Sequence, residues 1–131
     1  MSHIATYRTE ITKADPAILE RAVDFMCEHM DCKRVGEIHG FGRSYSPSGV
    51  GVIQEGMRYD ADLVIEGGAL SIHGDEYRQK EQFARFRKQV YQVYKAVAMQ
   101  TALERLNYQT DAVYQPTKKI RVVAQRTPCI G

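Results

Sequence analysis

The segment from residue 76 to residue 106 constrains the fold most, because it contains neither glycine nor proline. Hydrophobic side chains recur in it at intervals of three and four residues, the spacing of one face of a helix. These positions are Phe83, Phe86, Val90, Val93, Val97, Gln100 or Thr101, and Leu103. The spacing predicts a helix of about seven or eight turns, which is long for a domain of this size and is expected to lie against a β-layer.

The N-terminal part predicts a strand followed by a shorter helix. Residues 3–12 are rich in Thr, Tyr and Ile and alternate with period two, as a strand does. Asp15 can accept a hydrogen bond from the first turn of a helix, and Pro16 suits the first helical position. Apolar residues from Leu19 to Met30 follow at helical spacing, so a helix is expected over residues 16–30.

The remaining regular elements are predicted to be strands. Gly67-Gly68 offers a tight turn between two of them, and Asn107 suits the left-handed residue that ends the long helix. The expected strands cover residues 33–39, 61–66, 69–73, 108–114 and 119–125. Residues 39–51 hold four glycines and one proline, which predicts an irregular glycine-rich surface loop over about residues 39–58.

This order of elements predicts a single α+β domain over residues 1–131. We expect a mainly antiparallel sheet with one short and one long helix packed on one face, and a ferredoxin-like arrangement is compatible with that order. Hydrophobic residues make up 44% of the chain and charged residues 26%, as in ordinary globular proteins. No run approaches the roughly 20 apolar residues of a membrane span, and no secretion signal is recognised. With only three cysteines, a reducing cytoplasmic location is expected.

Charge is distributed unevenly along the sequence. Residues 1–75 carry 7 Lys or Arg against 12 Asp or Glu, whereas residues 76–131 carry 11 against 4. The two halves could complement each other within one fold, or the basic half could attract an anionic partner such as nucleic acid. The long helix also interleaves Tyr77, Tyr91 and Tyr94 with basic residues, a combination that suits single strands, although Tyr94 lies close to the apolar stripe.

Two local patterns are candidates for a metal-ion or anion site. Cys27, His29 and Cys32 offer thiolate and imidazole ligands, but Cys27 and His29 lie two residues apart on a helix and point away from each other. A buried structural cysteine is the simpler interpretation of Cys27. Gly40-x-Gly42 has neither the full Rossmann spacing nor the Walker lysine, which favours a plain surface loop over a phosphate cradle.

No catalytic signature occurs in the sequence. We therefore expect no enzyme, no catalytic residue and no cofactor. The leading hypothesis is a small non-enzymatic interaction or assembly module. We expect it to bind a protein partner or to associate with itself, and we expect no membrane partner. The alternatives are nucleic-acid binding through the basic C-terminal half and a metal- or small-ligand-binding domain. Candidate contact residues for a partner or nucleic acid are Arg43, Tyr45, Arg58, Arg85, Lys88, Lys95, Arg121 and Arg126.

Several short blocks resemble the hypothetical chloroplast reading frame thirty-five family of plastids, cyanobacteria, other bacteria and phages. They are Met1-Ser2-His3-Ile4 with Thr9 and Ile11, Gly40-Phe41-Gly42 ahead of residues 59–65, the long helix around Gln89, Tyr108, and Ile120-Arg121-Val122-Val123. The resemblance spans roughly residues 1–126. It implies a small conserved protein of unknown function and transfers no active-site residue.

Overall fold

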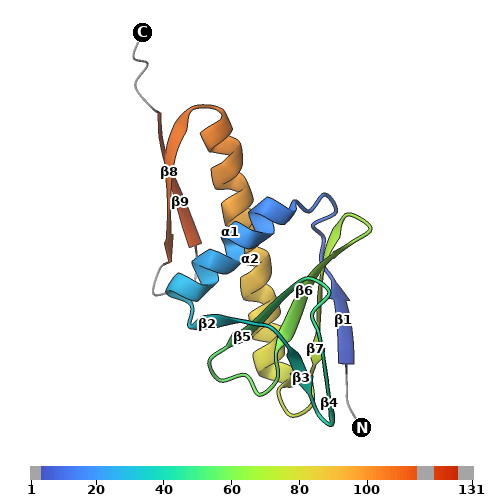
Figure 1. The fold of residues 1–131 in the computed structure, drawn as a ribbon. Coiled ribbons are helices and arrows are strands. Elements are labelled where there is room, and N and C mark those ends of the chain that lie inside the picture. The colour runs from blue at the N-terminus through green and yellow to red at the C-terminus, as the bar shows by residue number, and fades with distance from the viewer. Residues whose placement is uncertain (1–3, 115–119, 127–131) are drawn as a thin grey trace.

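The computed structural model describes residues 4–114 and 120–126 as an α+β fold (Figure 1). A five-stranded sheet has the order β1-β7-β6-β5-β2, and every neighbouring pair in it is antiparallel. Two further hairpins are β3–β4 and β8–β9. The elements are β1 (Ile4–Arg8), α1 (Pro16–His29), β2 (Cys32–Val35), β3 (Ile38–Gly40), β4 (Arg43–Tyr45), β5 (Val50–Gln54), β6 (Ala61–Glu66), β7 (Ala69–Asp75), α2 (Lys80–Arg105), β8 (Tyr108–Tyr114) and β9 (Ile120–Arg126).

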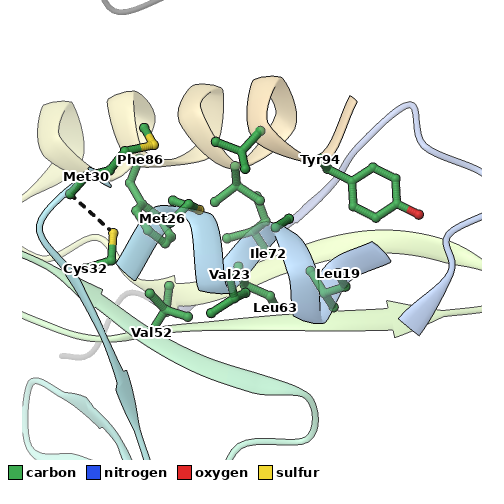
Figure 2. Packing of buried hydrophobic residues seen from close by; sticks show 14 of the residues in the cluster. Leu19, Val23, Met26, Met30, Cys32, Val52, Leu63, Ile72, Phe86 and Tyr94 are labelled. Atoms are coloured by element: carbon green, nitrogen blue, oxygen red, sulfur yellow. Dashed lines mark hydrogen bonds between the residues drawn. The ribbon is translucent and has the colours of Figure 1, made fainter. Parts of the chain in front are cut away.

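Both helices pack on one face of the sheet, as predicted. The core joins apolar side chains of α1 and α2 to those of the inner sheet face, among them Val23, Phe86, Val52, Leu63 and Ile72 (Figure 2). The C-terminal half of α2 runs past the sheet, and the β8–β9 hairpin lies along it (Figure 1). The strand order does not confirm a ferredoxin-like arrangement.

Helix α1 follows the local signals at its start. Asp15 caps it by accepting a hydrogen bond of 2.8 Å from the backbone N–H of Ala17, and Pro16 occupies the first turn. Its buried residues are Leu19, Ala22, Val23 and Met26. The predicted helix over 16–30 is therefore confirmed to within one residue.

Helix α2 begins at Lys80, four residues later than the sequence predicts. Gln79, just before it, is 2% exposed, and its amide binds the backbone of Arg58, Tyr59 and Asp75 instead of starting a helix. Arg78 in the same turn has a positive φ of 56°. At the other end Asn107 adopts the predicted left-handed conformation, with φ of 65°.

The predicted loop over residues 39–58 is wrong in large part. The strands β3, β4 and β5 lie within or across it, and only the connections between them are irregular. Gly42, with φ of 77°, makes the turn from β3 to β4. The predicted hairpin at Gly67-Gly68 is confirmed, with φ of 57° and 82° at the two glycines.

The apolar stripe of α2 is covered by the fold itself. Its buried residues are Phe83, Phe86, Val90, Val93, Tyr94, Val97 and Gln100. Tyr94 belongs to this core (Figure 2). Its hydroxyl accepts a 2.7 Å hydrogen bond from the backbone N–H of Asp15. Among the described residues, no helix is long and apolar enough to cross a membrane.

Candidate functional site

The outer face of the sheet, opposite the helices, carries three buried aspartates. Because side chains alternate along a strand, Asp62 and Asp75 point away from the face that holds Leu63 and Ile72. Asp62 accepts hydrogen bonds from the backbone N–H groups of Ser48 and Gly49, at 2.8 and 3.0 Å. Asp62 and Asp75 are each only 1% exposed.

The other two acceptors hold the β3–β4 hairpin. Asp75 accepts from the backbone N–H groups of Phe41 and Tyr77, each at 2.8 Å. Asp60 accepts from the backbone N–H of His39 at 2.8 Å, and the same oxygen lies 2.7 Å from Nδ1 of the His39 ring. Gly40 passes so close that a Cβ there would come within 2.9 Å of an Asp75 carboxylate oxygen. The three aspartates therefore fasten the segment from residue 39 to residue 49 to the sheet.

The pair of His39 and Asp60 has the form of a histidine oriented by a buried carboxylate. The His39 side chain is 58% exposed, so its Nε2 faces solvent, where Glu37 Oε2 lies 3.8 Å away. Such a pair can position a base or a metal ligand. Among the described residues, however, no group of three or more His, Cys, Asp or Glu side chains could hold a metal ion. The carboxylate is also already used by the hairpin backbone, so the arrangement serves to anchor the hairpin.

The three metal candidates from the sequence are not assembled into a site. Cys32 is buried in β2, and burial, with Cys27 and Asp31 nearby, raises the pKa of its thiol to about 12. A thiol that stays protonated at neutral pH is a poor metal ligand. The ring of His29 packs against Phe25, with 4.6 Å between centroids, and its Nε2 lies 3.5 Å from Glu28.

Arg43 and Tyr45 lie in β4, over the outer face of the sheet, and therefore on the side opposite α2. Burial raises the pKa of the Tyr45 hydroxyl, Asp62 and Asp75 add to this, and Arg43 opposes it. Arg58 is exposed in the connection between β5 and β6. Arg43 and Tyr45 therefore lie on a different face of the protein from the candidate residues of the long helix, Arg85, Lys88 and Lys95.

The helix candidates do share one surface. Arg85, Lys88 and Lys95 are exposed on the side of α2 that faces away from the core, and no acidic residue occurs between positions 82 and 103. Arg121 of β9 joins them, because it lines a groove of about 530 Å³ together with Lys95 and Met99. We call Arg85, Lys88, Lys95 and Arg121 the basic face. The backbone of Arg126 pairs with Tyr108, but its side chain lies outside the described part of the chain.

Ion pairs with the described residues do not neutralise the basic face. In the described ranges 4–114 and 120–126, none of its four cations has a carboxylate within 4.0 Å. Two arginines of residues 1–75 are paired instead: Arg34 contacts Glu20 and Asp24, and Arg21 contacts Glu104, all at 2.8 Å. Among the described residues, no ion pair joins an acidic side chain of residues 1–75 to a Lys or Arg of residues 76–131.

A second groove borders the same side of α2, along the open edge of β1. Its volume is about 330 Å³, and its lining includes Tyr7, Arg87, Lys88 and Tyr91. The carbon Cζ of Arg87 lies 3.5 Å from the centroid of the Tyr7 ring. Arg87 and Tyr7 were not singled out from the sequence, because 80 positions separate them and no local pattern links a strand residue to a distant helix residue.

Comparisons with protein-family models, with curated proteins and with solved structures find no match.

Proposed function

We propose that this protein is a non-enzymatic binding module whose basic face docks a strand of nucleic acid. The observation that carries the proposal is the row of exposed cations on α2, continued by Arg121, that has no acidic partner among the described residues. Unpaired exposed cations cost the fold little and attract polyanions through their combined field.

The extent of the basic face favours a polymer over a small anion. From Arg85 to Lys95 the cations are spread along about 15 Å of helix axis. One small anion cannot contact them together, whereas successive phosphates of a strand can. Tyr91 lies beside this row, with Lys95 Nζ 4.6 Å from its ring centroid, and offers an aromatic surface near the backbone path.

Self-association or a protein partner is the second candidate function. The apolar stripe of α2 is covered by the fold itself and so does not support this candidate. What favours this candidate is Met99, which is 56% exposed in the groove beside β9. Among the described strands β9 pairs with β8 alone, which leaves its other edge for strand addition. Light scattering during size-exclusion chromatography tests it, and a strict monomer at high concentration would remove self-association.

The decisive test measures binding of fluorescent single-stranded DNA and RNA oligonucleotides by anisotropy over a series of salt concentrations. We expect affinity to fall steeply with salt, with a logarithmic slope of about 0.7 for each phosphate contacted. The double variant Lys88→Glu, Lys95→Glu should weaken binding at least about tenfold and reduce the slope by about 0.7 for each lysine that contacts a phosphate.

A matched control keeps the net charge change identical. Lys13→Glu, Lys33→Glu reverses two exposed lysines outside the basic face and should leave most of the affinity intact. The proposal is wrong if the wild type binds no oligonucleotide at low salt. Equal losses from the two double variants would also refute it, because they would show an effect of net charge alone.

A further inference from the structure

The groove between β1 and α2 holds an arginine that the fold has positioned but not used. The guanidinium carbon of Arg87 lies 3.5 Å from the Tyr7 ring centroid and 5.9 Å from that of Phe83. Stacking of this kind fixes the plane of the guanidinium and leaves its in-plane N–H donors to other partners. Tyr7 belongs to the edge strand and packs against the core, so the platform under Arg87 is rigid.

Those donors have no partner within the described structure. Nε of Arg87 is buried and makes no hydrogen bond to any residue of the described ranges, and no carboxylate there lies within ion-pair distance of the guanidinium. A buried donor without an acceptor normally costs stability, so such atoms are uncommon in folded proteins. The buried Nε itself cannot be reached from the groove, but Arg87 lines it, and its terminal N–H donors, which have no acceptor among the described residues, suit a bound anion.

The rest of the lining favours an anion with several oxygens. Lys88 adds a second cation to the groove, against a single carboxylate, Glu10. That carboxylate is turned toward Tyr91, whose hydroxyl lies 3.4 Å from Glu10 Oε2. A phosphate can accept hydrogen bonds from two cationic side chains at once, and a volume of about 330 Å³ is within the range of small-ligand sites.

We infer that this groove binds the phosphate group of a nucleotide, with Arg87 as its principal donor. The inference rests on the proposed function and extends it, because Lys88 belongs to both the groove and the basic face. A strand that follows α2 past Lys88 therefore reaches Arg87. The phosphate can come from within a strand or from a free mononucleotide, and both sources present the same oxygens to the guanidinium.

The test distinguishes the contribution of the planar guanidinium group to binding affinity from the contribution of its positive charge. Arg87→Lys keeps the charge but loses the fork of donors and the stacking, so oligonucleotide affinity should fall about tenfold while the salt slope is unchanged. Tyr7→Leu removes the platform and should produce a similar loss, whereas Tyr7→Phe keeps the ring and should bind like the wild type. Circular dichroism and urea unfolding of each variant verify that the fold is retained.

A second arm titrates free uridine monophosphate, with uridine as the control, and follows backbone amide shifts by NMR. Shifts at β1 and α2 that require the phosphate and vanish in Arg87→Lys support the groove, even if no oligonucleotide binds and the proposed function fails. A different outcome is that the double variant Lys88→Glu, Lys95→Glu abolishes strand binding while Arg87→Lys and Tyr7→Leu bind like the wild type. That outcome would support the proposed function and overturn the groove inference. Absence of binding to both ligands overturns both.

Discussion

The two sides of this molecule treat charge in opposite ways. On the outer face of the sheet, Asp60, Asp62 and Asp75 are almost fully buried, and each accepts hydrogen bonds from the backbone of the segment from 39 to 49 or just after β7. On the exposed side of α2, the cations of the basic face lie in solvent without an acidic partner in the described ranges. Buried charge must be paired to be tolerated, whereas exposed charge need not be. The comparison identifies the aspartates as structural and the cations as available for a ligand.

The largest effect should come from removing one of the buried acceptors. Asp62→Ala leaves the backbone N–H groups of Ser48 and Gly49 without their partner and opens a space under them. We expect a loss of about 2–4 kcal/mol in the free energy of unfolding, measured by urea denaturation. Lys88→Ala on the other side should change it by less than about 0.5 kcal/mol. Equal losses would break the distinction between the two sides.

A smaller loss should follow from crowding the hairpin against its anchor. In Gly40→Ala the new Cβ would lie 2.9 Å from a carboxylate oxygen of Asp75, so the hairpin or the carboxylate must shift. The expected cost is about 1–3 kcal/mol in urea unfolding. Gly36→Ala is the matched control, because nothing lies within 4 Å of the added Cβ and its φ is not positive. A neutral Gly40→Ala would mean that the hairpin is not held tightly by Asp75.

How far the sequence predicts this fold depends on whether the signal is local. Periodicity located the buried stripe of α2, including Phe83, Phe86 and Val90, and capping chemistry located the start of α1 at Pro16. The start of α2 was placed too early because the side chain of Gln79 binds the distant residues Arg58 and Tyr59. Such a contact leaves no trace in the residues around position 79.

The same reason explains the error over residues 39–58. Glycine content alone predicts a loop, but the β3–β4 hairpin is held by the carboxylates of Asp60, just before β6, and Asp75, in β7, more than 20 positions away. For the site, helical periodicity correctly placed Arg85, Lys88 and Lys95 on an exposed face. It could not bring Arg121 beside Lys95 or Arg87 over Tyr7, because those proximities arise only from tertiary packing.

Reversing the charge of a cation that forms ion pairs should lower the free energy of unfolding modestly, whereas reversing unpaired cations should not. Arg34→Glu breaks the contacts to Glu20 and Asp24 and places like charges together, so we expect a loss of about 0.5–1 kcal/mol in the free energy of unfolding. Lys88→Glu, Lys95→Glu should cost nothing, or stabilise slightly by relieving repulsion among the cations of α2. Both are measured by thermal and urea unfolding at low salt, and the difference should shrink as salt rises. A clear loss in the α2 variant would show that these lysines have a structural role.

The smallest effect concerns the ion pair between Arg21 of α1 and Glu104 of α2. Arg21 donates to both carboxylate oxygens of Glu104, at 2.8 and 3.0 Å, and Thr110 donates to one of them, which together lower the pKa of Glu104. A lowered pKa means that the folded state favours the ionised carboxylate. The stabilisation is therefore complete above the ordinary value of 4.5 and is lost as the pH falls through the lower, folded value.

Both side chains of this pair are about two-fifths exposed, so solvent screening limits the contribution to a few tenths of a kcal/mol. Other carboxylates titrate over the same range, so we compare the wild type with Arg21→Gln instead of following the wild type alone. The gap between their free energies of unfolding should be present at pH 7 and closed at an acidic pH below the lowered, folded pKa of Glu104. The wild type and Lys95→Gln should not differ in their free energies of unfolding at either pH, because Lys95 has no carboxylate partner in the described ranges. A pH-dependent gap at Lys95 would reveal a neighbouring carboxylate and would weaken the case that the basic face is free to bind a phosphate strand.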